Sequence, residues 1–553
     1  MCGSPLAYSS GMMERIGPER LLILLALAVV LGLPLLMAPP EASRPDGARV
    51  LTVITPHNEQ IRQEFGRAFA SWHASEYGEP AVVEWVRPGG TSEIRKQLQA
   101  IYAAAIGDGR ITPEGGLADP DDPANRMPYD LLFGGGSWEH GQMKRGVSAR
   151  PPGSDEAVTV PISKPAPFSA ERLEEWYGPE NRIGAGPLYD EEGYWLGNAT
   201  SGFGIVYNRD VLDRLGLDEP TGWDAMTDPR LAGWVALADP RQSGSVATAY
   251  NSILDNYGWD EGWRILREMA ANARYFSNDS KKVPIDVSQG EAAMGVAIDF
   301  YGRYQSQAVM QPGETPETSR VGYIDPPGVV LIDPDPISML RGGPEPELAK
   351  RFIEFLLSDE GQALWQFPAR GDEPTPSGAA GDVARGGETG GEGGGEGGGL
   401  GPREFELRRM PARRDFIERY RDRFIDKVDP FEIASDVESR GWRSAVGPMM
   451  GAFAIDIHAD QTAAWAAINA ARRAVAAGDA DPALLDRMLR LFHEMPTHVT
   501  RDGEELLFSP ENYRVIRNDW RDAGRWAEAR IRYLAFFRGN YRAVERLWRE
   551  ARS

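Results

Sequence analysis

The feature that most constrains the fold is an alternation of short apolar runs and helical patterns. β-rich runs at Arg49–Thr55, Ala81–Val86 and Tyr129–Phe133 each end in a loop of small or polar residues, and helical spacings of apolar residues follow the first two. Strands that alternate with helices form parallel sheets through right-handed crossovers, so we expect an α/β fold. The pattern repeats with new material between Ser201 and Tyr301, which predicts a second α/β lobe.

The loops that follow these strands are the first candidates for a binding site. In open α/β sheets, ligands bind beyond the carboxyl ends of the strands. His57 follows the first run, Thr91 and Ser92 follow the second, and Gly134–Ser137 follows the third. We therefore expect all three loops at one ligand-binding edge.

The segment from Val235 to Tyr250 combines a strand, a turn of small residues and the start of a helix. An apolar run ends at Ala238, and apolar residues at helical spacing begin after Ser243, Gly244 and Ser245. Ser243 or Ser245 is the natural N-cap. Free backbone N–H groups and the positive end of a helix dipole suit an anionic oxygen ligand. An ordinary capped helix is the alternative interpretation.

The N-terminus carries an export signal. Residues 1–46 contain the uncharged run Leu21–Ala38, preceded by Arg15 and Arg20. Arginines before such a run place that end in the cytoplasm. We expect a periplasmic protein that residues 21–38 anchor in the inner membrane, with a cleaved signal peptide as the alternative.

The charged residues of the chain limit the kinds of molecule that it can bind. The chain has 553 residues with 60 Lys and Arg against 82 Asp and Glu, a net charge of −22. Such acidity argues against binding nucleic acid. Residues 371–402 are rich in Gly and Glu and are expected to form a disordered insert. Residues 403–553 are mostly helical by pattern, and their role is open.

Five segments resemble a known family in the expected order. They are LTVITPHNEQIRQEF, PGGTSEIRKQL, SGFGIVYNRDVLDRLGL, GEAAMGVAID and AKRFIEFLLSDEGQALW. Together they resemble the extracellular solute-binding proteins of ABC transporters, in particular the ferric-iron branch. The resemblance implies a two-lobed periplasmic-binding-protein-like fold of type II, with ligand held between the lobes. Lobe one would comprise residues 48–200 and 325–370, and lobe two residues 203–323.

The resemblance leaves two classes of ligand open. Family ferric binders use a His from the first loop, a carboxylate and a pair of Tyr residues; His57 and Tyr301 match, but Phe300 replaces the second Tyr. Ferric iron would then be cargo, and we expect no cofactor. Hydroxyl-rich loops favour an oxyanion such as a phosphate or phosphonate instead. The expected ligand-binding residues are His57, Thr91, Ser92, Ser201, Ser243, Gly244, Ser245, Ser280, Asp299 and Tyr301.

The sequence offers little for catalysis. His493 and His498 lie five residues apart with Pro496 between them, so one helix face cannot present both to a metal. We therefore expect a binding receptor, not an enzyme, whose partners are a small ligand and an ABC permease. A sensor or enzyme ectodomain on the same fold is the alternative.

Overall fold

A computed structural model describes Leu27 and residues 45–315, 317–371 and 399–552. The chain divides after Ala48, and both lobes lie in the unit Arg49–Ser553. Within the described residues, no helix is both long enough and apolar enough to cross a membrane. The anchor expected at residues 21–38 lies outside the described residues, Leu27 excepted.

The first lobe is built on a sheet in the order β2-β1-β3-β12-β7. β1 pairs in parallel with both β2 and β3, whereas β12 is antiparallel to β3 and to β7. Apolar residues on α2, α11 and α12 pack against this sheet around Phe65, Phe133 and Trp365. The elements are β1 (Arg49–Ile54), α2 (Glu59–Tyr77), β2 (Ala81–Val86), α3 (Thr91–Gly107), β3 (Leu131–Phe133), α4 (Ser137–Arg145), β12 (Ile332–Leu340), α11 (Pro346–Leu356) and α12 (Asp359–Gln366).

The second lobe continues the sheet in the order β7-β10-β8-β9. β8 pairs in parallel with β10 and β9, and β10 is antiparallel to β7. The elements are α6 (Arg209–Leu215), β8 (Val235–Ala238), α7 (Gly244–Tyr257), α8 (Trp259–Ala271), β9 (Ala273–Ser277), α9 (Lys282–Ser288), β10 (Met294–Ile298), α10 (Asp299–Ala308) and β11 (Val321–Ile324). α6 has the bounds that the sequence pattern predicts.

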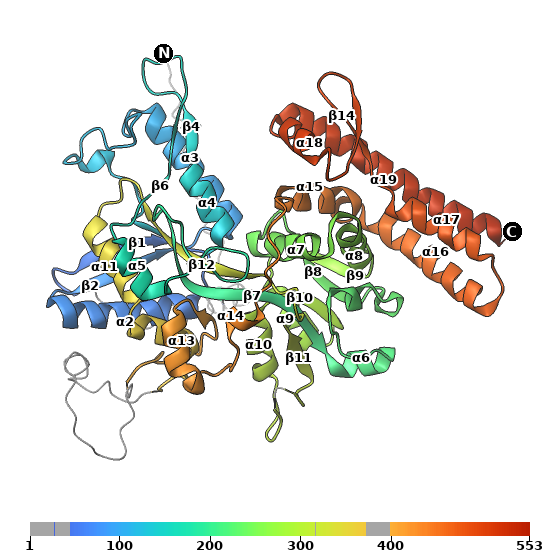
Figure 1. Ribbon diagram of the computed structural model, residues 1–553, viewed down its shortest axis with the longest axis horizontal. Coiled ribbons are helices and arrows are strands. Elements are labelled where there is room, and N and C mark those ends of the chain that lie inside the picture. The colour runs from blue at the N-terminus through green and yellow to red at the C-terminus, as the bar shows by residue number, and fades with distance from the viewer. Residues whose placement is uncertain (1–26, 28–44, 316, 372–398, 553) are drawn as a thin grey trace, which may run out of the picture. The chain divides into compact units, whose positions relative to one another are not determined.

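One long strand, β7 (Leu196–Asn208), belongs to both lobes (Figure 1). Its residues from Leu196 to Gly202 pair with β12, and its residues from Phe203 to Tyr207 pair with β10. All 13 residues of β7 are buried, because they run through the middle of the sheet. β7 begins five residues before Ser201, where the second set of strands and helices was expected to start.

The segment after the insert returns to lobe one, although the sequence pattern assigned residues 403–553 to a helical region. The chain comes back beside the point where it left, since the backbone N–H of Arg370 donates to Pro402 O at 2.9 Å. The carboxylate of Glu64 on α2 then accepts three backbone N–H groups, from Arg403, Glu404 and Phe405, at 2.7–3.0 Å. β13 (Met410–Pro411) next adds to the edge of β7.

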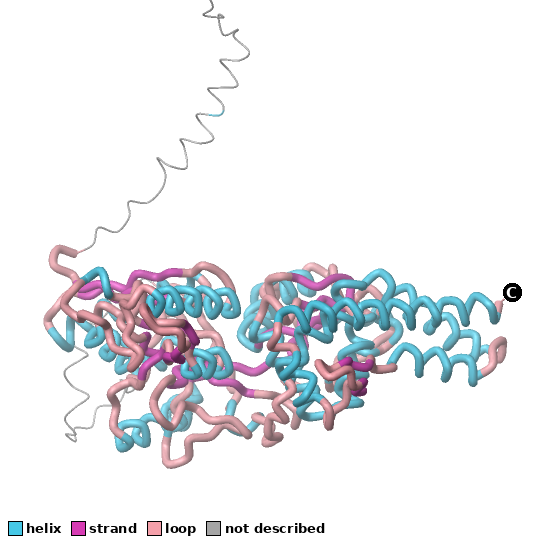
Figure 2. The backbone as a smooth tube through the Cα atoms, turned by 90° about the horizontal axis from the view of Figure 1, so that it is seen from above, coloured by secondary structure: helices cyan, strands magenta, loops and turns pink. Residues whose placement is uncertain are grey.

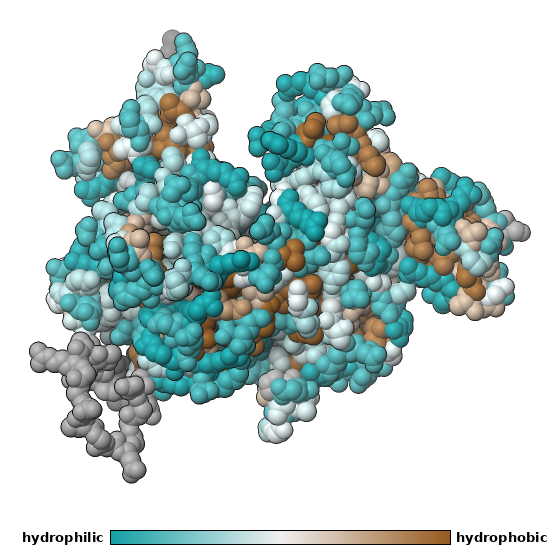
Figure 3. All heavy atoms as spheres, in the orientation of Figure 1, coloured by the Kyte–Doolittle hydropathy of each residue, from teal (hydrophilic) through white to brown (hydrophobic). Residues whose placement is uncertain are grey.

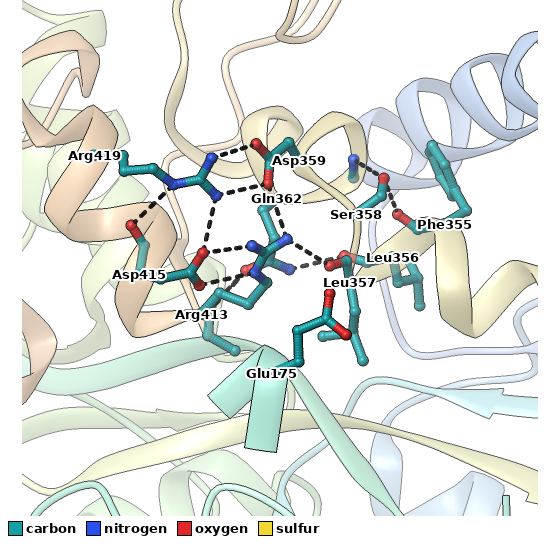
Figure 4. Close-up of polar contacts among 12 residues, drawn as sticks. Glu175, Phe355, Leu356, Leu357, Ser358, Asp359, Gln362, Arg413, Asp415 and Arg419 are labelled. Atoms are coloured by element: carbon teal, nitrogen blue, oxygen red, sulfur yellow. Dashed lines mark hydrogen bonds and ion pairs between the residues drawn. The ribbon is translucent and has the colours of Figure 1, made fainter. Parts of the chain in front are cut away.

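A network of ion pairs fastens α13 (Arg414–Tyr420) to α12 (Figure 4). Arg413 and Arg419 each contact both Asp359 and Asp415, at 2.5–3.0 Å. Gln362, buried on α12, donates to Leu356 O and accepts the backbone N–H of Ala412. Residues 403–420 are therefore held on lobe one by buried and half-buried polar contacts.

The remaining C-terminal helices pack on lobe two and share one apolar core with it (Figure 2). A short hairpin of β14 (Thr497–Val499) and β15 (Glu505–Leu507) interrupts this region, which the sequence pattern predicted to be mostly helical. The helices are α15 (Arg443–Phe453), α16 (His458–Ala477), α17 (Pro482–His493), α18 (Tyr513–Asp519) and α19 (Ala523–Ala551).

Candidate functional site

His57 lies at the centre of a buried polar cluster on the hinge side of lobe one. It directly follows β1, and its Nε2 is 2.8 Å from Asp335 Oδ2 on β12. Arg409, delivered by the segment after the insert, contacts the same Asp335 oxygen and lies 3.1 Å from His57 Nε2. Arg409 Nε also donates to Ser201 Oγ on β7 at 3.0 Å. Two of the expected residues, His57 and Ser201, are thus joined by an arginine that the sequence did not single out.

Electrostatics fix the charge states in this cluster. Burial lowers the pKa of His57, so its imidazole is neutral at physiological pH. Burial alone would raise the pKa of Asp335, but the charge of Arg409 and the hydrogen bond from His57 outweigh it and hold this pKa well below its ordinary value. The cluster therefore contains one ion pair, Arg409 with Asp335, and a neutral histidine.

Tyr301 on α10 faces the same cluster from lobe two. Burial is the main cause that raises the pKa of its phenol above the ordinary value, opposed by the charge of Arg409. Its ring packs on Phe300, with centroids 4.1 Å apart, and the Arg409 guanidinium lies 4.6 Å from the centroid of the Phe300 ring. Tyr304, which follows one helical turn later, is 44% exposed and cannot take part.

Asp299 ties the start of α10 to β7, the strand that belongs to both lobes. It is buried at the start of α10 and accepts the backbone N–H groups of Gly202 at 3.0 Å and Phe300 at 2.7 Å. Burial raises the pKa of Asp299 to about 6, while Arg303 lowers it. These contacts tie α10 to the middle of β7, next to Ser201.

Three cations from the two lobes, Arg62, Arg87 and Lys281, lie near one another. Burial and the like charges of Arg87 and Arg62 lower the pKa of Lys281, and the charge of Lys281 in turn acts on His57. Arg62 and Arg87 belong to lobe one, and Lys281 precedes α9 in lobe two. Among residues 45–315, 317–371 and 399–552, no carboxylate lies within salt-bridge distance of any of the three.

The expected serine and threonine residues are placed at helix starts. Thr91 is buried and Ser92 half-buried at the first turn of α3, and a Cβ at Gly135 would lie 2.4 Å from Thr91 Cγ2. Ser243 is the N-cap of α7, because its Oγ accepts the N–H of Val246 at 3.4 Å. Ser245 and Ser280 are half-buried on lobe two.

The lobes touch beside these helix starts. A Cβ at Gly90 would lie 3.3 Å from Gln242 O, and one at Gly244 would lie 2.5 Å from Glu139 Oε1. Thr91 and Ser243 therefore come from opposite sides of one interface, while His57, Ser201 and Tyr301 lie at the hinge cluster.

Asp333, Asp335 and Arg409 were not predicted as site residues, and only the two aspartates carry a signal in the sequence. Asp333 and Asp335 belong to an Asp-Pro-Asp-Pro run inside the apolar strand β12, and buried carboxylates in a strand are an unusual feature. Burial raises the pKa of Asp333 to about 6, against the hydrogen bonds from Ser137. Arg409 has no comparable feature, because only the folded chain brings it beside His57.

Part of the chain is similar to a known protein family. A family model described as bacterial extracellular solute-binding protein matches residues 180–383. Residues 180–383 are therefore similar to bacterial extracellular solute-binding proteins. The prediction of this family from the sequence is thereby confirmed. The matched residues include β7, the whole of lobe two and β12.

Curated relatives of this solute-binding region match only in part. The phosphoglycerate transport regulatory protein PgtC of Salmonella typhimurium is 25% identical over 173 residues, which cover 30% of this chain and 39% of that protein. An uncharacterized protein of Haemophilus influenzae is 30% identical over 164 residues, 30% of this chain and 44% of that protein. The chain thus spans less than half the length of these relatives.

Similarity to solved structures is low both in sequence identity and in TM-score. The periplasmic binding protein AfuA from Actinobacillus pleuropneumoniae, with exogenous fructose-6-phosphate bound, is 16% identical with a TM-score of 0.42, covering 57% of this chain and 81% of that chain. The ferric binding protein from Campylobacter jejuni is 15% identical with a TM-score of 0.44, covering 72% and 99%.

Proposed function

We propose that this chain is an extracellular receptor that captures a small oxyanionic solute between its lobes and delivers it to an ABC permease. The observation that carries the proposal is a set of three cations, Arg62 and Arg87 of lobe one and Lys281 of lobe two, in which both arginine charges act on the lysine. In the described residues, no carboxylate lies within salt-bridge distance of any of the three. Like charges held together are unfavourable unless an anion joins them. A phosphate ester supplies several acceptor oxygens for such a set.

Arg409 favours an oxyanion over ferric iron at this site. Its guanidinium lies 3.1 Å from His57 Nε2, the nitrogen that would otherwise coordinate a metal, and it forms an ion pair with Asp335. A fixed positive charge at this position repels a metal cation and attracts an anion. Within the described residues, no group of three or more His, Cys, Asp or Glu side chains is placed to hold a metal. The name of the Salmonella relative, which refers to phosphoglycerate transport, is consistent with this choice.

The test compares ligands and two adjacent lysines. Isothermal titration with 3-phosphoglycerate, inorganic phosphate and ferric citrate should give saturable binding of a phosphate species and none of iron. Lys281→Gln should raise the Kd by about 10- to 150-fold, the equivalent of one lost hydrogen bond to a charged group. Lys282→Gln is the matched control, because Lys282 pairs with Asp286 on its own helix. Binding of ferric citrate alone, or equal effects of the two variants, would overturn the proposal.

A further inference from the structure

The side chain of Arg443 extends from the C-terminal helices to lobe one. It is the first residue of α15, and its side chain is 13% exposed. Its Nη2 donates to Glu139 Oε1 on α4 of lobe one at 3.2 Å and to Gly244 O on α7 of lobe two at 2.9 Å. Its Nε donates to Thr248 Oγ1 at 3.1 Å. One guanidinium therefore joins three parts of the molecule.

The side chains that Arg443 contacts on lobe one suit the planar, charged guanidinium of an arginine. The Arg443 guanidinium lies 4.0 Å from the centroid of the Trp138 ring, next in sequence to Glu139. Glu139 is only 2% exposed, and its carboxylate lies against the first residue of α7, where a Cβ at Gly244 would be 2.5 Å from Oε1. A planar guanidinium can stack on a ring and pair with a carboxylate at once, which a lysine cannot do as well.

This contact lies at the interface between the lobes, where Glu139 of lobe one meets Gly244 of lobe two. In the orientation of Figure 1, the surface is hollowed between the part that carries α3 and α4 and the part that carries α15 and α18 (Figure 3). Opening the lobes would separate Glu139 and Trp138 from Arg443 and Gly244. It would also leave the Glu139 carboxylate without its ion pair, since Arg443 is the cation within salt-bridge distance of it.

We infer that Arg443 is a latch residue, through which the C-terminal helices hold the two lobes closed. Arg443 is a positioning residue: it has no place in the hinge cluster and acts on ligand binding by raising the population of the closed form. The apparent Kd of a ligand equals its intrinsic Kd divided by the fraction of protein in the binding-competent form. Loss of the latch therefore weakens binding and speeds release.

The first experiment measures closure without any ligand, so its result does not depend on the proposed function. The full chain with Cys2→Ser carries no other cysteine. Spin labels are placed through Ala100→Cys on α3 and Asp213→Cys on α6, which are both exposed and lie on different lobes. Pulsed electron resonance should give one narrow distance in the parent protein and a broader distribution shifted to longer distances in Arg443→Ala.

Matched variants separate the latch from general destabilisation. Arg440→Ala is the control, because Arg440 is exposed in the same stretch and stacks on Trp442 on its own side. Gly244→Ala disturbs the contact between Glu139 and lobe two. Alanine suits a helix at least as well as glycine, but its Cβ would meet the Glu139 carboxylate. We expect Gly244→Ala and Arg443→Ala to broaden the distances, and Arg440→Ala to leave them unchanged.

The second experiment, which does rest on the proposed function, titrates the same variants with 3-phosphoglycerate. Arg443→Ala should raise the Kd by about 5- to 150-fold, the usual range of coupling between two sites, mostly through faster release. Glu139→Gln combined with Arg443→Ala should be no worse than either variant alone. Unchanged distance distributions in Arg443→Ala and Gly244→Ala would overturn the latch. Altered distances without 3-phosphoglycerate binding in any variant would support the latch and contradict the proposed ligand.

Discussion

Glu64 offers the sharpest test of how the candidate site is assembled. Its carboxylate, 2% exposed, accepts the backbone N–H groups of Arg403 at 2.7 Å, Glu404 at 2.8 Å and Phe405 at 3.0 Å. These bonds position the segment that delivers Arg409 to His57. In Glu64→Gln, one oxygen becomes an NH2 group that faces a donor. One lost charged hydrogen bond and one orphaned N–H group should lower the free energy of unfolding by about 3–5 kcal/mol.

Urea denaturation of the Gln variant measures this loss directly. Glu404→Gln is the control, because the pair of Glu404 with Arg67 is about half-exposed on both sides and such pairs contribute about 0–1 kcal/mol. Glu64→Gln should also weaken binding of 3-phosphoglycerate, since Arg409 would lose its fixed position. If both variants change the free energy of unfolding by less than about 1 kcal/mol, the segment is held by its apolar contacts and the argument from Glu64 is refuted.

Four further predictions follow from the same contacts and patterns. Burial lowers the pKa of His140 from 6.5 to about 4, so its contribution to the free energy of unfolding is complete above pH 6.5 and is lost as the pH falls toward 4. His140→Gln should reduce this loss by up to about 3 kcal/mol. An unchanged pH profile of the urea midpoints would contradict this prediction. Deletion of residues 381–399 should lower the melting temperature by no more than a few degrees, because the composition there cannot build a core; a larger loss in calorimetry would count against this. Ser243→Ala with Ser245→Ala should weaken ligand binding by about 1–3 kcal/mol and cost about 1 kcal/mol of stability; titration that finds unchanged affinity with lost stability would make both serines plain caps. The fragment that begins at Gly47 should stay soluble without detergent, and partition into micelles alone would show otherwise.

Strands in both lobes could be predicted because short apolar runs mark them in the sequence. The runs Ala81–Val86 and Val235–Ala238 become β2 and β8 with the expected bounds. Ser243 was one of two candidates for the cap of α7, and the structure selects it. Local signals of this kind depend on neighbours within a few residues, which a sequence displays directly.

The composition of the hinge cluster could not be predicted in the same way. Arg409 lies 352 positions from His57 in the sequence, and the segment between them includes the insert. The residues around Arg409 carry no pattern that distinguishes it from Arg408, which instead pairs with Asp426. Which arginine enters the site is decided by β13, because its pairing with Thr200 and Ala199 sets the register of the segment.

The C-terminal helices cannot be treated as a separate appendage, because a buried arginine joins them to lobe two. Arg267 on α8 is 1% exposed and donates to the carbonyl groups of Phe492 at 2.7 Å and Glu494 at 3.1 Å. Its guanidinium also lies about 5 Å from the rings of Phe453 and Phe537. Without those helices, the cation would face water beside an exposed apolar surface.

This anchoring matters for the proposed latch. Arg443 can hold lobe one only if α15 is itself immobile relative to lobe two, because a helix that moved freely on lobe two could not restrain lobe one. The shared core and Arg267 supply that immobility on one side, and the stacking of Arg443 on Trp138 supplies the contact on the other. The C-terminal helices thus extend lobe two beyond the residues that the family model matches, and they give it a further contact with lobe one besides the hinge. In the proposed receptor, affinity depends on the balance between the open and closed forms as well as on the residues that touch the ligand.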